Sequence, residues 1–309
     1  MANRDLETVR VFREAGPRGR LILDDGSRRV DLTAQLIESG QPTDLVGLFE
    51  TGFFDEGELR QRLFGEGAES WKAVDSEWDG NALPEVATPI HPASVGKILC
   101  LGKNFRAHAE EFGEGVPEEP LFFNKLPETL VPHRTEVTVP DWYVGRVDHE
   151  AELAVIIGLE GTEIDPEDAL EHVGGYTVAN DLTARSMQGR DRKKGHPWLR
   201  SKNLNQFCPL GPCFVPRDFL DVSDLRVRAT VWSDGKPTER QNASTRDFVV
   251  DVPSAIAWLS RHITLRPGDL ILMGTPAGVG PLEDGDQVLC SVDRIGELAT
   301  TIRRSEGHD

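Results

Sequence analysis

The chain has 309 residues and carries 34 basic against 52 acidic side chains, a net charge of −18. Phosphate backbones are bound by basic surfaces, so this balance argues against a nucleic-acid partner. No apolar run is long enough to cross a membrane and the N-terminus lacks the apolar stretch of a signal peptide, so we expect a cytoplasmic protein without membrane attachment.

The length allows about two domains, and we expect a small N-terminal domain with its linker at 1–95 and a catalytic domain at 96–309. Two short strands and two short helices are predicted in the first, at Val9–Phe12, Leu21–Asp24, Thr43–Glu50 and Glu56–Leu63. The proline-containing stretch Asn81–Ser94 is predicted to be the linker. Carboxylates in this part are dispersed, which favours a solvated acidic face over a site.

From Lys97 onward, short apolar runs bounded by Gly, Pro and Asp predict many strands. They are expected at Ile98–Leu101, Leu121–Asn124, Glu150–Ile157, Tyr176–Asn180, Leu225–Trp232, Asp269–Met273 and Gln287–Asp293. Helices are expected at Phe105–Phe112, Pro166–Val173, Leu182–Gly189 and Pro253–His262, the last with Asp251 as its N-cap. Mostly strands with scattered helices predict an all-β or β-rich α+β fold rather than a doubly wound sheet.

Two glutamates open the strand expected at 150–157. Alternate residues of a strand share a face, so Glu150 and Glu152 should project together. No basic residue alternates with them, and a divalent cation would hold both carboxylates ionised. Oxygen ligands of this kind favour Mg²⁺, Mn²⁺ or Ca²⁺ over zinc. A solvent-facing strand is the alternative interpretation.

Asp181 ends the apolar run Tyr176–Asn180 and directly precedes an expected helix. It is either an N-cap of that helix or a third carboxylate beside the two glutamates. Three protein oxygens would leave room for waters and a chelating substrate, as in Mg²⁺ sites.

A basic stretch follows, with seven Lys or Arg residues and one acid between Arg185 and Lys202. Beside a cation site, such a stretch would attract a small anionic substrate. For its middle residues a solvated basic surface is the simpler interpretation.

Two further features have chemical potential. On a helix, His108 and Glu111 would be neighbours, and a carboxylate beside an imidazole raises its basicity as the activation of a water requires. The Gly/Pro-rich turn Gly274–Pro281 could cradle a carboxylate with its backbone N–H groups and Thr275. A structural ion pair and a tight connecting loop are the respective alternatives. Motifs of nucleotide binding, serine hydrolases and zinc proteases are missing.

In their order along the chain, these motifs resemble the fumarylacetoacetate hydrolase superfamily over about residues 97–303. The matching stretches are Gly102–Glu111, Pro120–Lys125, His149–Leu153, Gly175–Arg185, Lys194–Trp198, Cys208–Pro212 and Gly274–Pro281. The sequence is most similar to the branch of acylpyruvases, oxaloacetate decarboxylases and hydroxymuconate isomerases.

The resemblance implies a mixed β-roll core in an α+β, β-rich fold, and a homodimer. It implies Mg²⁺ or Mn²⁺ on Glu150, Glu152 and Asp181. It also implies catalytic roles for His108, Glu111 and Lys202, with the first two on a lid. The residues that match positions holding the substrate's oxoacid end are Arg185, Gln188, Lys202 and Thr275, and Lys125 matches a substrate-binding lysine near the site.

Three departures from the family pattern concern the pocket. Phe105 stands where tyrosine is usual, and Ser186 where aspartate is common. The stretch Leu126–Thr129 replaces a Pro-Ser-Ser/Thr run.

We therefore expect a metal-dependent hydrolase that cleaves a C–C bond of a 2,4-dioxo acid, of acylpyruvate or fumarylpyruvate type, to pyruvate and a carboxylic acid. Such a role belongs to the catabolism of aromatic compounds. The alternatives are oxaloacetate decarboxylation and isomerisation of a hydroxydienoate such as 2-hydroxyhepta-2,4-diene-1,7-dioate, because each passes through an enolate that the same metal would stabilise. A non-catalytic binding protein is the alternative of another class.

Overall fold

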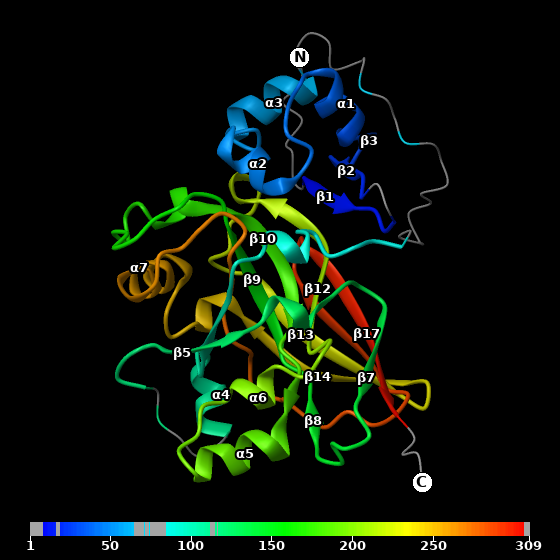
Figure 1. Ribbon diagram of the computed structural model, residues 1–309, viewed down its shortest axis with the longest axis vertical. Coiled ribbons are helices and arrows are strands. Elements are labelled where there is room, and N and C mark those ends of the chain that lie inside the picture. Colours follow the sequence, from blue (N-terminus) through cyan, green and yellow to red (C-terminus); the bar gives the residue numbers. More distant parts are fainter. Residues whose placement is uncertain are drawn as a thin grey trace.

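The computed structural model describes residues 9–16, 19–64, 71, 74, 85–111, 115 and 117–305. One large sheet connects the N-terminal segment to the rest of the molecule (Figure 1). Its strand order is β3-β2-β1-β12-β10-β9-β15-β4-β5, with β6 paired to β12 beside this path. In that order the strands span Arg29–Asp31, Leu21–Asp24, Arg10–Arg13, Cys208–Pro216, Val173–Asn180, Ala151–Ile157, Leu270–Leu272, Ile98–Gly102 and Leu121–Lys125, and β6 spans Leu130–Val131.

A second sheet of five strands has the order β14-β13-β16-β17-β7. Its strands span Lys236–Ser244, Arg226–Ser233, Gln287–Val292, Gly296–Arg304 and Thr135–Val139. Burial alternates along β13 and β16, as expected for strands with one face on a core. The second sheet packs on β9, β10 and β12 of the large sheet and so covers the strands that lead to the site.

The N-terminal segment continues the core's sheet instead of standing apart from it. Strand β1 pairs with β12, where Val11 lies opposite Phe214. Its helices are α1 (Leu32–Glu38), α2 (Leu45–Glu50) and α3 (Glu56–Phe64). The ring of Phe214 lies 5.2 Å from that of Phe54 and 5.5 Å from that of Phe49, measured between centroids. The predicted boundary at 95/96 falls just before β4.

Three short helices gather at the end of the molecule opposite α1–α3 (Figure 1). They are α4 (Arg106–Glu111), α5 (Arg185–Lys193) and α6 (Leu199–Lys202). A longer helix, α7 (Val252–His262), begins as predicted, with Asp251 accepting the Ser254 N–H and a proline in its first turn. No helix in the described part of the chain has the length and apolar character needed to cross a membrane.

The β-rich mixed fold and each predicted strand are confirmed, with shifts at the ends. Two helix predictions need correction. The helix predicted at Pro166–Val173 is only a short 3-10 turn at Ala169–His172, because Val173 already begins β10. The helix predicted from Leu182 begins at Arg185, because residues 183–184 form β11 and pair with β8 (Val147–Asp148). Parts of two predictions, Phe112 and residues 81–84, lie outside the described residues.

Candidate active site

The ends of two paired strands bring three carboxylates together. Glu150 directly precedes β9, Glu152 is its second residue, and Asp181 directly follows β10. The strands are antiparallel with Asn180 opposite Ala151, so the start of β9 meets the end of β10. All three carboxylates are buried, and each offers an oxygen within 4.8 Å of the others. The three predicted metal ligands therefore form one cluster.

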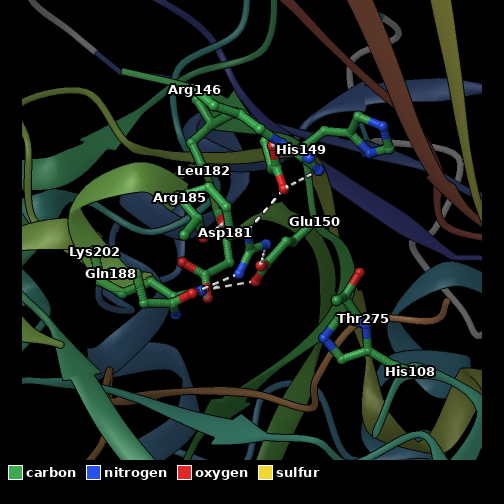
Figure 2. A network of polar contacts seen from close by, with 12 residues as sticks. His108, Arg146, His149, Glu150, Asp181, Leu182, Arg185, Gln188, Lys202 and Thr275 are labelled. Atoms are coloured by element: carbon green, nitrogen blue, oxygen red, sulfur yellow. Dashed lines mark hydrogen bonds and ion pairs between the residues drawn. The ribbon is translucent and has the colours of Figure 1, made fainter. Parts of the chain in front are cut away.

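Two buried lysines form ion pairs with this cluster. Nζ of Lys202 on α6 donates to Glu150 Oε2 at 2.7 Å and to Asp181 Oδ2 at 2.6 Å (Figure 2). Nζ of Lys125, at the end of β5, donates to Asp181 Oδ1 at 2.8 Å and to the carbonyl oxygen of Lys202 at 2.5 Å. The sequence offered no cation on the strand of the glutamates, and the structure supplies the cations from other elements.

Arg185, the first residue of α5, contacts the carboxylate oxygen of Glu150 that Lys202 does not bind. Its guanidinium forms an ion pair with Glu150, donates to Asp148 Oδ2 at 2.7 Å and donates to Gln188 Oε1 at 2.6 Å. The N-cap of α5 is Ala184, so the interpretation of Asp181 as a helix cap is wrong. Its side chain binds the lysines instead.

Glu150 and Glu152 have opposite pKa shifts although only one residue separates them. Burial alone would raise the pKa of Glu150, but Lys202 and Arg185 outweigh it and hold that pKa below its usual range. Burial, then the charges of Asp181 and Glu150, raises the pKa of Glu152. A divalent cation would relieve this repulsion, and three carboxylates are hard oxygen donors, so the cluster fits Mg²⁺ or Mn²⁺.

An imidazole faces the cluster from α4. His108 Nδ1 lies 3.3 Å from Glu111 Oε2, and both carboxylate oxygens of Glu111 lie 3.2 Å from the Gly278 N–H nitrogen that donates to them. Burial lowers the pKa of His108, against the opposite effect of Glu150 and Glu111. The ring is therefore neutral at neutral pH, which a proton acceptor requires.

The Thr275 loop (274–281), which follows β15, closes over the start of β9. Its first N–H, on Gly274, donates to Glu152 Oε2 at 2.7 Å, and Thr275 Oγ1 donates to the Ala151 carbonyl at 2.9 Å. Gly274 has a φ of 89°, and a Cβ there would lie 2.8 Å from Cβ of Asn104. Only glycine suits that position, so the loop can approach the carboxylates closely.

One cavity joins most of these groups. Eight of the ten predicted site residues line it, namely His108, Glu150, Glu152, Asp181, Arg185, Gln188, Lys202 and Thr275. Lys125 and Glu111 lie behind that lining and hold Asp181 and His108. The wall also includes Lys103, Arg192 and apolar side chains such as Phe123 and Trp198. Sequence reasoning assigned no role to Lys103 and treated Arg192 as solvated surface, although the basic stretch was a usable signal.

Comparisons with known proteins give one family match and several sequence and structural relatives. Residues 97–303 match the family model described as fumarylacetoacetate (FAA) hydrolase C-terminal. The chain is 35% identical to a mitochondrial oxaloacetate tautomerase of Xenopus laevis, over 93% of this chain and 86% of that protein. It is similar to a 5-carboxymethyl-2-hydroxymuconate delta-isomerase from Mycobacterium smegmatis, with a TM-score of 0.68 and 32% identity over 96% of this chain and 100% of the other. A fumarylpyruvate hydrolase from Pseudomonas aeruginosa, in complex with Mn²⁺ and pyruvate, has a TM-score of 0.65 and 34% identity over 74% of this chain and 100% of that one.

Proposed function

Because the chain belongs to the fumarylacetoacetate hydrolase family of enzymes, we propose that it interconverts the enol and keto forms of a small 2-oxo dicarboxylate of oxaloacetate type, with Mg²⁺ or Mn²⁺ on Glu150, Glu152 and Asp181. A relative that covers nearly the whole chain carries the name oxaloacetate tautomerase. The hydrolysis expected from the sequence is kept as the second candidate.

The observation that carries the proposal is the order of charges along one cavity. Its floor consists of the three buried carboxylates, and its more exposed end contains Lys103 and Arg192. Both cations line the same cavity, and burial, then the charge of Arg192, lowers the pKa of Lys103. A cation at the floor would bind the 2-oxo acid end, and this pair suits a second carboxylate.

The residues have the properties that an enolate reaction needs. A bound divalent cation would polarise the 2-oxo group and stabilise the enolate. His108 has Nδ1 on Glu111, which leaves Nε2 as the ring nitrogen that moves the proton to and from C3 of the substrate. Although burial would lower the pKa of Lys202, Asp181 and Glu150 raise it, so this side chain remains a fixed positive charge beside the developing enolate.

Hydrolysis of a 2,4-dioxo acid is the second candidate because the contact between His108 and Glu111 also suits the activation of a water. In that reaction His108 takes a proton from water, the water oxygen adds to C4, the C3–C4 bond breaks, and the pyruvate enolate is then protonated at C3. Decarboxylation of oxaloacetate and isomerisation of a hydroxydienoate share the enolate and remain predictions. So do the homodimer and the cytoplasmic location.

The test is to follow the decay of three substrates with Mn²⁺ and with EDTA. Faster enol-to-keto conversion of oxaloacetate, with total oxaloacetate unchanged, supports the tautomerase. Pyruvate formed from oxaloacetate indicates decarboxylation, and stoichiometric pyruvate from acetopyruvate indicates hydrolysis. A hydroxydienoate that isomerises without losing carbon indicates the fourth reaction. Failure to convert any of them, with Mn²⁺ shown to be bound, would contradict the proposal.

A separate experiment tests whether Arg192 binds the second carboxylate of the substrate. Arg192→Met should raise KM for oxaloacetate about tenfold, the loss of one exposed charged contact, and leave KM for a monocarboxylic substrate such as acetopyruvate unchanged. Lys193→Met, at the exposed neighbouring position of α5, is the matched control. Equal effects of the two variants would remove Arg192 from substrate recognition.

A further inference from the structure

Gln241 lies on β14, does not line the cavity, and is fully buried. Its side-chain amide makes four hydrogen bonds, the full capacity of a glutamine side chain. The oxygen accepts from the Ala151 N–H at 3.0 Å and faces Nδ1 of His149 at 3.2 Å. The nitrogen donates to Thr275 Oγ1 and to the Pro276 carbonyl, both at 2.7 Å. One amide therefore connects the start of β9 to the Thr275 loop.

These partners fix which way the amide faces. A backbone N–H only donates and a backbone carbonyl only accepts, so the oxygen of Gln241 must face Ala151 and its nitrogen must face Pro276. His149 then donates through Nδ1, and its ring points away from Asp181 and Lys202 (Figure 2). The amide thus has a single orientation.

On strand β9, Gln241 contacts the residue that lies between two of the carboxylates. Ala151 separates Glu150 from Glu152, and both polar atoms of its backbone are bound from outside its own sheet. Its N–H donates to Gln241 and its carbonyl accepts from Thr275. These two bonds hold the peptide groups on either side of Ala151, which link it to Glu150 and to Glu152.

In the Thr275 loop, Gln241 contacts the hydroxyl of Thr275, the residue that matches a substrate-binding position. A threonine hydroxyl has one proton, and Thr275 receives a hydrogen bond from Gln241 while giving its own proton to Ala151. When an anionic oxygen of the substrate arrives, this proton is free to turn from the carbonyl to the substrate. Gln241 meanwhile keeps the hydroxyl oxygen in place.

From this geometry we infer that Gln241 is a positioning residue of the active site: it holds the Thr275 hydroxyl toward the oxoacid end of the substrate and keeps Glu150 and Glu152 aligned across Ala151. It acts through these residues and does not touch the substrate itself. The inference rests on the proposed function only in taking Thr275 as a substrate contact.

The test uses the full-length protein with Mn²⁺, and with oxalate as a probe that resembles the oxoacid end and is not turned over. Gln241→Met retains the length of the side chain and removes all four hydrogen bonds. Titration calorimetry should show about tenfold weaker oxalate binding, the equivalent of one lost hydrogen bond. It should also show weaker Mn²⁺ binding. KM for the converted substrate should rise by a larger factor than kcat falls. Asn242→Ala is the control, because Asn242 is the exposed next residue and bonds Glu239; it should leave all four quantities unchanged.

A double-mutant cycle separates positioning from general destabilisation. If Gln241 acts through Thr275, adding Gln241→Met to Thr275→Val should cost little further oxalate affinity. Fully additive losses, or a Gln241→Met protein that binds oxalate and Mn²⁺ like the wild type, overturn the inference. Gln241→Glu serves in place of Gln241→Met should the latter fail to fold, because it retains the shape and an oxygen toward Ala151 but, when ionised, has no proton for Thr275.

The outcome for the wild type distinguishes the two proposals. A wild-type protein that binds Mn²⁺ but neither oxalate nor any substrate contradicts the proposed function. The inference is then decided by Mn²⁺ affinity alone: weaker binding in Gln241→Met than in Asn242→Ala supports it, and equal binding overturns it.

Discussion

Charged side chains meet in two parts of this molecule, and they do so differently. In the N-terminal unit, Arg20 contacts Glu14 and Asp31 while 38% of its side-chain surface is exposed. At the ends of β9 and β10, Lys202 contacts Glu150 and Asp181 with 2% of its side-chain surface exposed. In each of the two sites, one cation bridges two carboxylates. Only the second is removed from water and lines a cavity, so burial and convergence, rather than the number of ion pairs, indicate the functional site.

The largest effect is expected where the buried network loses its cation. Lys202→Met leaves Glu150 and Asp181 facing each other without Lys202, so the metal-free protein should lose about 3–5 kcal/mol of its free energy of unfolding. Activity should fall about 10³-fold, since the fixed charge beside the enolate is lost. Urea denaturation in EDTA and steady-state kinetics measure the two. If Lys202→Met is as stable in EDTA as the wild type, burial of this network carries no cost, and the contrast between the two sites would not hold.

His108→Gln should have the next largest effect, a fall in rate of about 10²-fold, because glutamine cannot accept the proton. Burial lowers the pKa of this ring, so wild-type activity should persist below the ordinary histidine value of about 6.5 and decline only at lower pH, as the ring becomes protonated. The same shift means that the folded protein resists this protonation, so its stability should decrease as pH falls from the ordinary value toward the lowered one. The pH profile of kcat/KM checks the assignment. If the acid limb persists unchanged in His108→Gln, another group titrates.

Much of this site was predictable because its residues follow local rules. Alternation along a strand placed Glu150 and Glu152 on one face, and the end of an apolar run placed Asp181 beside them. Helical spacing placed His108 on Glu111. Each of these arguments needs only neighbours in the chain, and the family resemblance supplied the remaining positions.

What the sequence did not reveal depends on contacts between distant segments. Gln241 lies on a strand whose polar residues gave no strand pattern, and its partners are about 30 and 90 positions away in the chain. Strand β12 was missed because its three prolines argue against a central strand, although it is fully buried. Helix α1 was missed as well, and its start is fixed by Asp31, whose side chain accepts the Ala34 N–H.

Removal of the divalent cation should affect the buried network and leave the exposed one unchanged. With Mn²⁺ at about 100 times its Kd, the folded protein should gain about 2.7 kcal/mol over the metal-free state. Thermal denaturation in EDTA and in Mn²⁺ measures this shift. Glu152→Gln should reduce it, whereas a change at Glu14 should not. A protein that shows the same melting temperature with and without Mn²⁺ would favour the non-catalytic interpretation.

The smallest effect is expected from Arg20→Met, which removes the cation of the exposed network. Arg20 makes two hydrogen bonds to Glu14, at 2.8 and 2.7 Å, and one to Asp31 at 3.1 Å, so its geometry is as good as that of Lys202. Water and salt screen these charges, so the free energy of unfolding should fall by about 1 kcal/mol or less, and less still in high salt. The value of kcat/KM should not change. A loss as large as that of Lys202→Met, or a change in kcat/KM, would show that the N-terminal unit acts on the site through the pairing of β1 with β12, and the two networks would then have to be treated as one.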